Sequence, residues 1–205
     1  MNKFQNLLKN KKLLIFDFDG TIANTSIFHE QAFKEVLINY NINFFYRDIA
    51  GLSSEDAFQK IFHENDIFIT NKALSDLVRQ KQHIARKLIS KHLEPSEGLS
   101  DFLIWAEDLF KICIVSSGSS SSIINALQKI KLENFFDKII CAEDVENTKP
   151  NPEGFIKALE TFSINPEEAI IFEDSDSGFE AADGAGIIYL DVNLFSWSDL
   201  YTNNI

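Results

Sequence analysis

One short stretch constrains this chain more than any other: the apolar residues Leu13 to Phe16, followed directly by Asp17-Phe18-Asp19-Gly20. Continuous apolar runs of this length are typical of strands buried in a parallel sheet. Open α/β sheets bind their ligands at the carboxyl ends of such strands, which is where the two aspartates lie. Because side chains alternate along an extended chain, Asp17 and Asp19 point the same way, and Phe18 turns back toward the core.

Two carboxylates at one strand end repel each other, and this repulsion raises the pKa of one of them. A divalent cation would relieve the repulsion and leave one carboxylate free to attack a phosphorus atom. The alternative interpretation is a simple turn with a helix cap, since Asp, Gly and Thr are ordinary turn residues. The stretch by itself leaves both interpretations open.

Strands and helices alternate in the second half of the chain. Apolar runs predict strands at 112–115, 138–142, 169–172 and 187–190, and helical spacing predicts helices at 119–130, 153–162 and 177–183. Such alternation gives a parallel sheet with right-handed crossover connections. With the first strand added, the sequence predicts an α/β fold in which a Rossmann-like parallel sheet has helices on both faces.

Three helices without an intervening strand follow the first strand. Their apolar residues recur at helical spacing over 27–40, 53–62 and 72–92. Because the first strand must join the sheet, we interpret this segment as a small all-helical cap inserted after it. The predicted division is a core domain of residues 1–23 and 95–205 and a cap domain of residues 24–94.

Charge and composition exclude some classes of function. A formal net charge of −12 argues against nucleic-acid binding, which depends on Lys and Arg neutralising phosphates. No apolar stretch approaches the roughly 20 residues of a membrane span, so we expect neither a membrane segment nor a secretion signal. Cys113 and Cys141 lie in apolar runs without neighbouring Cys or His. We therefore expect reduced core cysteines in a cytoplasmic protein.

Polar residues follow further predicted strands. Ser116-Ser117-Gly118 precedes a helix, and hydroxyl and backbone N–H groups at a helix start can bind an anion. Lys149 lies in a loop between a strand and a helix, where it would offset charge on a phosphoryl group. Glu173 and Asp174 offer the oxygen ligands that Mg²⁺ prefers. Each feature has an ordinary alternative, which is helix capping for the serines and acids and solvent exposure for the lysine.

Together these residues resemble the haloacid dehalogenase superfamily of phosphotransferases. The matching motifs are Asp17-Phe18-Asp19-Gly20-Thr21, Ser116, Lys149-Pro150-Asn151-Pro152 and Phe172-Glu173-Asp174-Ser175, the last followed by Gly178, Ala181, Ala182 and Gly186. They extend from residue 13 to about residue 190, which is nearly the whole chain. The helical insertion resembles the small mobile cap of that superfamily.

Within the superfamily the chain is most similar to the β-phosphoglucomutase-like branch of phosphatases and mutases. The stretch from Gly51 to Asp56 resembles the cap loop of that branch, and His29 and Lys81 match positions near the cap. The mutase carries an arginine, which binds the second phosphate of the substrate, where this chain has Ser54. Asn24 also replaces the aspartate that is usual shortly after the first motif.

The resemblance implies phosphoryl transfer in two steps through an aspartyl-phosphate. Asp17 would attack the phosphorus, and Asp19 would protonate the leaving oxygen and then take a proton from water. Mg²⁺ would be held by Asp17, Asp174, the backbone carbonyl of Asp19 and Glu173. The phosphoryl oxygens would be held by Ser116, Lys149 and the backbone N–H of Ser117. The remaining positions expected to bind phosphate or substrate are Gly20, Thr21, Gly118, His29, Ser54 and Lys81.

The favoured function is a Mg²⁺-dependent phosphatase that acts as a monomer on a small phosphorylated metabolite, with sugar phosphates among the candidates. A sugar phosphomutase of the β-phosphoglucomutase type is the first alternative. A catalytically idle phosphate-binding regulatory protein is the second, although such a protein would gain nothing from keeping Asp19. Dehalogenases of the superfamily need neither the second aspartate nor a metal, so they fit poorly.

Overall fold

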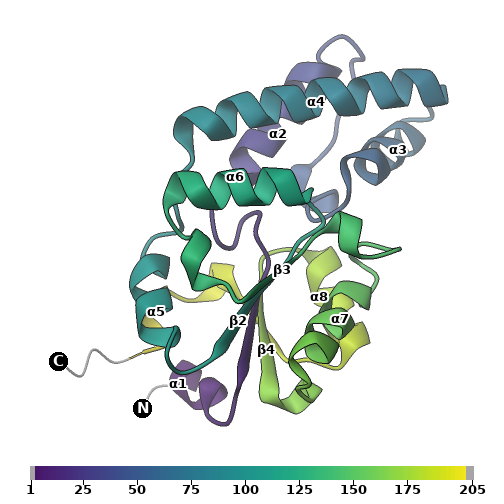
Figure 1. Cartoon of the computed structure of the whole chain (residues 1–205). Helices are drawn as coiled ribbons and strands as arrows, with labels where there is room; N and C mark the ends of the chain where they lie inside the picture. Colours follow the sequence, from purple (N-terminus) through teal and green to yellow (C-terminus); the bar gives the residue numbers. More distant parts are fainter. Residues whose placement is uncertain (1–2, 202–205) are drawn as a thin grey trace.

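A computed structural model describes residues 3–201 and places a five-stranded parallel sheet at the centre of the core (Figure 1). In spatial order the strands are β3 (Lys138–Ile140), β2 (Lys111–Val115), β1 (Leu13–Phe16), β4 (Ala169–Glu173) and β5 (Tyr189–Asp191). Ile15 in the central strand is opposite Cys113 of β2 and Ile171 of β4, and every neighbouring pair of strands is parallel. The predicted α/β class with a Rossmann-like parallel sheet is confirmed.

Alternating side chains of the strands divide the core into two layers. On one face, Leu14 and Phe16 pack with α5 (Leu99–Ala106) and α6 (Ser120–Ile130). On the other face, Leu13 and Ile15 pack with α7 (Glu153–Phe162) and α8 (Asp176–Ala185). All these residues of β1 are fully buried, because helices cover both faces of the sheet (Figure 1). This arrangement explains why the strand is apolar throughout instead of alternating with polar residues.

The segment between β1 and α5 forms a helical lobe above the carboxyl ends of the strands (Figure 1). Its helices are α2 (Ser26–Leu37), α3 (Ser54–Glu64) and α4 (Asn71–His92). They share a hydrophobic cluster of their own, which includes Phe33, Phe58 and Phe62. The chain leaves and re-enters the core side by side, where Ala23 pairs with Pro95. The division into a core of 1–23 and 95–205 and a cap of 24–94 remains a proposal, and this separate cluster supports it.

The observed elements differ from the predicted ones in a few places. The strand expected at 138–142 ends at Ile140, because a 3-10 turn begins after Cys141. The Asp144 carboxylate accepts a hydrogen bond from the Cys141 N–H at 2.9 Å and holds this turn. The last strand is Tyr189–Asp191 in place of 187–190. Two observed helices, α5 and the short α1 (Lys3–Leu8), have no counterpart among the predicted ones.

Both cysteines are buried and free, as the sequence predicts. Burial raises the pKa of the Cys113 and Cys141 thiols to about 12, so neither forms a reactive thiolate near neutral pH. Within residues 3–201, no helix is long and apolar enough to cross a membrane. The cytoplasmic location remains a prediction.

The segment after β5 packs back onto the core. The Trp197 ring lies 5.7 Å from that of Phe16, 5.3 Å from that of Phe102 and 5.1 Å from that of Phe172, measured between centroids. Phe16 and Phe172 also stack on each other at 4.8 Å. Aromatic clusters of this kind bury a large apolar area and add favourable ring contacts. The cluster therefore joins β1, β4, α5 and the C-terminal segment.

Replacing Trp197 by alanine removes the ring at the centre of this cluster. We expect Trp197→Ala to lower the free energy of unfolding by about 3–5 kcal/mol. The control is Leu194→Ala in the same segment, because Leu194 is 74% exposed; the expected change there is within about 0.5 kcal/mol. Urea denaturation followed by circular dichroism measures both, and equal effects would contradict a structural role for the Trp197 ring.

Candidate active site

The carboxyl ends of the central strands bring most of the predicted site residues together. These residues are Asp17 and Asp19 after β1, Ser116 after β2, and Glu173 and Asp174 at the end of β4. The Asp17 N–H donates to the Phe172 carbonyl at 2.9 Å, so the sheet itself fixes the first acid. The strand order reverses here, because β2 and β3 extend from one side of β1 and β4 and β5 from the other. Open α/β sheets bind ligands at such a switch point.

Lys149 reaches this cluster from the loop before α7, and its side chain is buried. Its Nζ atom lies 2.6 Å from Asp17 Oδ1 and 2.7 Å from Glu173 Oε2. Burial alone would lower the pKa of Lys149, but Asp17 and Glu173 outweigh it and raise the pKa above its ordinary value. The ammonium is therefore charged at neutral pH, and the alternative of a solvated loop lysine is wrong.

Glu173 holds Lys149 and is itself held by several donors. Its Oε1 atom accepts from the Asp174 N–H at 3.0 Å, the Ser175 N–H at 3.2 Å and the Ser175 hydroxyl at 2.9 Å. Gly178 packs directly against this side chain, and a Cβ atom there would lie 2.0 Å from Glu173 Cδ. The serine and glycine that follow the acid pair therefore keep Glu173 in place.

The Asp19 carboxylate has a different set of partners. The Thr25 hydroxyl donates to its Oδ1 atom, and His29 Nε2 lies 3.3 Å from the same oxygen. Burial would raise the pKa of Asp19, but His29 and Thr25 lower it to about 2. Asp19 is therefore ionised at neutral pH. No sequence motif singles out Thr25, which is fully buried just before α2.

The helical lobe contributes the three cap residues predicted from the sequence: His29 from α2, Ser54 from α3 and Lys81 from α4. Lys81 Nζ lies 2.9 Å from His29 Nδ1 and 3.1 Å from the Ser54 hydroxyl. An ammonium can only donate, so Nδ1 accepts and the Nε2–H of His29 faces Asp19. Burial lowers the pKa of Lys81 to about 8, although the charge of Asp19 opposes this effect. A chain of polar contacts thus connects α4 to Asp19.

The carboxylates of Asp17, Glu173 and Asp174 form the part of the site that suits a cation. Each offers an oxygen atom, and these atoms lie within 4.8 Å of one another. Burial and the neighbouring acids raise the pKa of Asp17 well above its usual range and that of Asp174 to about 7. Oxygen donors that repel one another in this way fit Mg²⁺. The Asp19 side chain is outside this group, so only its backbone carbonyl remains as the predicted ligand.

Gly20 and Thr21 lie at the edge of this carboxylate cluster. Gly20 has a φ of +94°, and a Cβ atom there would lie 2.0 Å from Asp174 Oδ2. Glycine is therefore required both by the backbone conformation and by the nearby carboxylate. The Thr21 side chain is fully buried.

Ser116, Ser117 and Gly118 form the turn between β2 and α6. The Ser116 hydroxyl accepts a hydrogen bond from the Gly118 N–H at 3.0 Å. The hydroxyls of Ser117 and Thr21 are buried and have no hydrogen-bond partner among the residues that the structure describes. Buried hydroxyls without a partner are uncommon, and the Ser117 hydroxyl is a donor available at the predicted phosphate site.

A cavity of about 730 Å³ lies between the helical lobe and the core. Six of the predicted site residues line it. Two of them belong to the turn between β2 and α6, and the six are Asp19, His29, Ser54, Lys81, Ser117 and Gly118. Asp17 and Lys149 do not line it and are 7% and 5% exposed. A cavity of this size is typical of small-molecule sites.

The lobe also contacts the core near the site through the loop around Ala50 and through Tyr46. Ser177 donates from its hydroxyl to the Ala50 carbonyl at 3.2 Å, which joins α8 to the lobe. At Gly51 in the same loop, a Cβ atom would lie 2.1 Å from Ser177 Oγ. Burial and the charge of Asp19 raise the pKa of Tyr46, although a hydrogen bond with the Ser26 side chain opposes this. Tyr46 is therefore near Asp19, Asp174 and Asp17, although no motif contains it.

Comparison with known proteins agrees with this geometry. The model of a family described as haloacid dehalogenase-like hydrolase matches residues 14–192. The chain belongs to this family. A fructose-1-phosphate phosphatase of Escherichia coli is 30% identical over 185 residues, which cover 88% of this chain and 96% of the relative. A phosphorylated carbohydrates phosphatase of Thermotoga maritima is 26% identical, over 85% of this chain and 81% of the relative.

Solved structures show the same fold. A β-phosphoglucomutase of Clostridium difficile matches with a TM-score of 0.77 at 24% identity, over 88% of this chain and 84% of the other. A hydrolase of Pseudomonas syringae matches with a TM-score of 0.79 at 21% identity, over 93% and 89% of the two chains. The fold therefore agrees with the family that the model over residues 14–192 shows and that the resemblance of the motifs predicts.

The raised pKa of Asp174 gives a stability prediction for the metal-free hydrolase. An acid whose pKa rises from 3.8 in the unfolded chain to about 7 in the folded one destabilises the folded state as the pH rises through this range. Asp174→Asn removes this charge. At pH 8 in EDTA we therefore expect the variant to melt roughly 2–8 °C above wild type, and near pH 4 we expect the difference to disappear.

Differential scanning fluorimetry across this pH range measures the effect. Asp176→Asn is the control, because Asp176 is an exposed acid on the first turn of α8, where the helix dipole favours a negative charge. This variant is not expected to melt above wild type. A melting temperature of Asp174→Asn below that of wild type at pH 8 would contradict repulsion among the clustered carboxylates.

Proposed function

We propose that this hydrolase is a Mg²⁺-dependent phosphatase that acts on a small phosphorylated metabolite, with sugar phosphates as the first candidates. The observation that carries this proposal is the position of Asp17. It is fixed by Lys149, lies next to Glu173 and Asp174, and has a second, separately held acid, Asp19, beside it. The phosphatases of Escherichia coli and Thermotoga maritima named above support the choice of substrate class.

Asp17 is the proposed nucleophile. Lys149 holds its Oδ1 atom, and the other carboxylate oxygen would attack the phosphorus, which forms an aspartyl-phosphate and releases the alcohol oxygen. The charged Lys149 and the Ser116 and Ser117 groups would orient the phosphoryl oxygens, and such positioning supplies most of the catalysis in phosphoryl transfer. Gly20, Thr21 and Gly118 would shape the space around these oxygens.

Asp19 is the proposed proton carrier. A pKa of about 2 makes it a carboxylate before substrate binds, which is the form that takes a proton from water in the hydrolytic step. To protonate the leaving oxygen it must first gain a proton, and the negative charge of a bound phosphate raises the pKa of a neighbouring acid in the required direction. The contacts with Thr25 and His29 keep the carboxylate oriented throughout.

Mg²⁺ is the proposed cofactor. Asp17, Asp174 and Glu173 would hold it, together with the backbone carbonyl of Asp19. When bound, it would supply positive charge to the phosphoryl oxygens. The proposal is supported by the raised pKa values of Asp17 and Asp174, which are typical of acids that lack a neutralising cation.

The helical lobe is proposed to close over the substrate and to exclude bulk water. Its residues His29, Ser54 and Lys81 would contact the part of the substrate that carries no reacting phosphate. Lys81 is 5% exposed and already bonded to the other two, so the three would act as one preformed group. That the enzyme acts as a monomer remains a prediction.

A sugar phosphomutase is the alternative within the same family, and a β-phosphoglucomutase shares the fold. A mutase must hold the second phosphate of a bisphosphorylated intermediate, for which a bidentate arginine is well suited. This chain has Ser54 at that position, which favours hydrolysis. An idle regulatory protein is less consistent with the site, because Asp19 keeps a buried, oriented carboxylate that mere phosphate binding does not need.

The nucleophile is tested by Asp17→Asn. The amide has nearly the same shape but is a poor nucleophile, so we expect phosphate release to fall to less than about one hundredth of the wild-type rate while the protein remains folded. Circular dichroism is the control for folding. Retention of more activity than this would contradict covalent catalysis by Asp17, because help with proton transfer alone is worth at least about a hundredfold.

Phosphatase and mutase are separated by following two products at once. The enzyme is incubated with β-glucose 1-phosphate, Mg²⁺ and a trace of glucose 1,6-bisphosphate, and a panel of phosphate esters is assayed in parallel. We expect phosphate release from panel esters to exceed glucose 6-phosphate formation, and EDTA to abolish turnover until Mg²⁺ is restored. Faster formation of glucose 6-phosphate than release of phosphate from any ester would overturn the phosphatase proposal, and full activity in EDTA would overturn the metal requirement.

A further inference from the structure

The cavity extends well beyond the proposed catalytic groups. From Asp19 and Lys81 it continues between α4 and α6 as far as Ile89 and Lys129. The residues that α4 contributes recur every three to four positions, so one face of the helix forms this wall. A volume of about 730 Å³ leaves room for a substrate part remote from the reacting phosphate.

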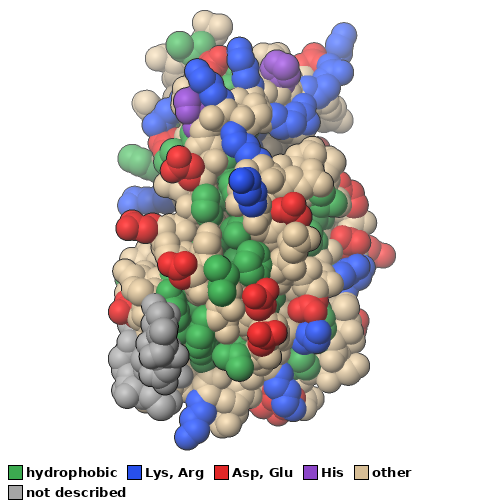
Figure 2. Space-filling model, turned by 60° about the vertical axis from the view of Figure 1, so that its left-hand side comes forward, with side chains coloured by type: hydrophobic (Ala, Val, Ile, Leu, Met, Phe, Trp, Pro, Cys, Tyr) green, Lys and Arg blue, Asp and Glu red, His purple; other side chains and the backbone are tan. Residues whose placement is uncertain are grey.

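Three cations line the cavity in an otherwise acidic protein, namely Lys81, Arg86 and Lys129, and the acids of the lining are Asp19 and Glu55. α4 carries six Lys and Arg and one Asp, whereas the whole chain has a formal net charge of −12. Lys and Arg side chains accordingly gather over the helical lobe in the space-filling view (Figure 2). Such a local excess of positive charge attracts anionic ligands.

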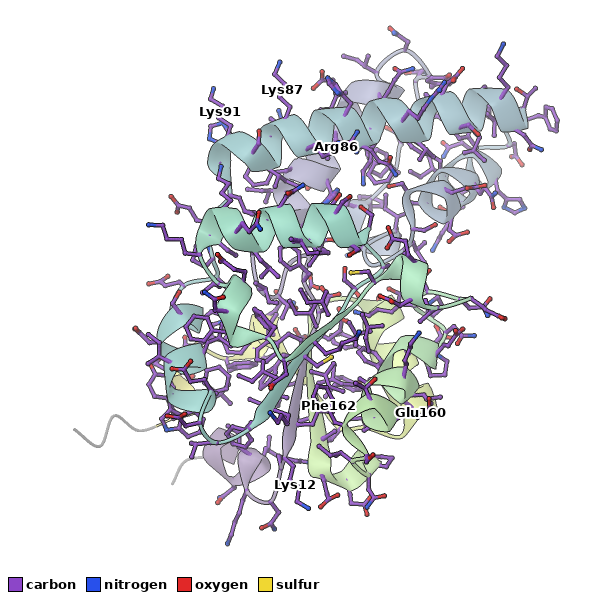
Figure 3. All side chains as sticks on the ribbon, in the orientation of Figure 1. Lys12, Arg86, Lys87, Lys91, Glu160 and Phe162 are labelled. Carbon is purple, nitrogen blue, oxygen red and sulfur yellow. The ribbon has the colours of Figure 1, made fainter. Side chains whose placement is uncertain are left out.

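Most of the Lys and Arg side chains that line the cavity already have hydrogen-bond partners. Lys81 is bonded to His29 and Ser54, and Lys129 donates to the carbonyls of Ile89, at 3.2 Å, and Ser90. Arg86 is the exception, since it makes no hydrogen bond or ion pair with any residue between 3 and 201. Its neighbour Lys87 and, one turn later, Lys91 point away from α6 (Figure 3). Arg86 therefore lines the cavity with an unpaired guanidinium.

Arg86 lies further along α4 than Lys81, the α4 residue that is bonded to His29, and both line the cavity. It follows Lys81 by five residues, which corresponds to a rise of roughly 7.5 Å along the helix. A guanidinium presents donors in a planar fork that matches the two oxygens of a carboxylate or phosphate. Ser122 and Asn125 of α6 also line the cavity and offer neutral polar groups for the hydroxyls of such a chain.

We propose that Arg86 binds an anionic group, either carboxylate or phosphate, at the end of the substrate opposite the reacting phosphate. The preferred substrates are then phosphate esters that carry a second acidic group. This inference rests on the proposed phosphatase function and makes Arg86 a specificity-determining residue for it. It also gives the chain a cation for a remote anion at a position on α4, whereas the cap loop has the neutral Ser54 at the position where the mutase has an arginine.

The test compares two linear esters of equal length, 6-phosphogluconate, which ends in a carboxylate, and sorbitol 6-phosphate, which ends in a hydroxyl. We expect wild type to favour 6-phosphogluconate by about tenfold in kcat/KM, mainly through KM, since one charge-assisted contact at an exposed side chain is worth about this factor. In Arg86→Gln this preference is lost. Lys87→Gln changes the same charge one residue away and keeps the preference. The ratio of kcat/KM for fructose 1,6-bisphosphate to that for fructose 1-phosphate shows whether a second phosphate group is preferred as strongly as a carboxylate.

A binding measurement separates this inference from the proposed function. Calorimetric titration of the Asp17→Asn protein, with and without Arg86→Gln, gives the affinity for both linear esters in the absence of turnover. We expect Arg86→Gln to weaken 6-phosphogluconate binding about tenfold relative to sorbitol 6-phosphate. If wild type hydrolyses no ester, the proposed function fails and this titration alone decides the role of Arg86. Equal preference in wild type and Arg86→Gln, in rate or in affinity, overturns the inference.

Discussion

The buried contacts of Lys149 with Asp17 and Glu173 are the interaction on which the site depends. Three carboxylates meet at one sheet edge, and taking them out of water without a positive partner would be strongly unfavourable. Lys149 supplies one positive charge within hydrogen-bond distance of two of them. One cation does not neutralise three acids, so the pKa values of Asp17 and Asp174 remain raised. The proposed divalent cation would relieve this shortage of positive charge.

The sheet makes this concentration of acids possible. β1 lies between β2 and β4, and the strand ends on both sides deliver their polar residues to the same edge. Helices cover both faces of the sheet, so the apolar side chains of the central strands are buried below the site. Fixed dipoles and charges in such surroundings act more strongly than they would in water.

The helical lobe is organised differently. Its hydrophobic cluster is separate from the two layers of the core, and it reaches the site through polar contacts such as those of His29 with Asp19 and of Ser177 with Ala50. Phe28 of α2 and Ile89 of α4 also pack against the core layer that contains α5 and α6. The cavity residues of the lobe, Arg86 among them, thus come from elements other than the strands that position Asp17, Glu173 and Asp174.

Local sequence by itself determined the α/β class and the acids at the strand ends. Apolar runs and the polar residues after them are local features, and the parallel sheet then brings Asp17, Asp19 and Glu173 to one edge by geometry alone. Tertiary structure decided which groups these acids contact. Thr25, which donates a hydrogen bond to Asp19, belongs to no sequence motif. Only the folded loop shows that the Lys149 side chain is buried and not solvated.

Helix α5 and the burial of the Trp197 ring likewise could not be predicted from local sequence patterns. The helix is apolar on most of its surface and the sequence around Trp197 is short and mixed, so neither has a periodicity that marks a buried face. Periodicity reports which face of an element is buried and does not report what covers it. That choice depends on contacts between residues far apart in the chain, such as Phe16 with Trp197 and His29 with Lys81, which exist only after the whole chain has folded.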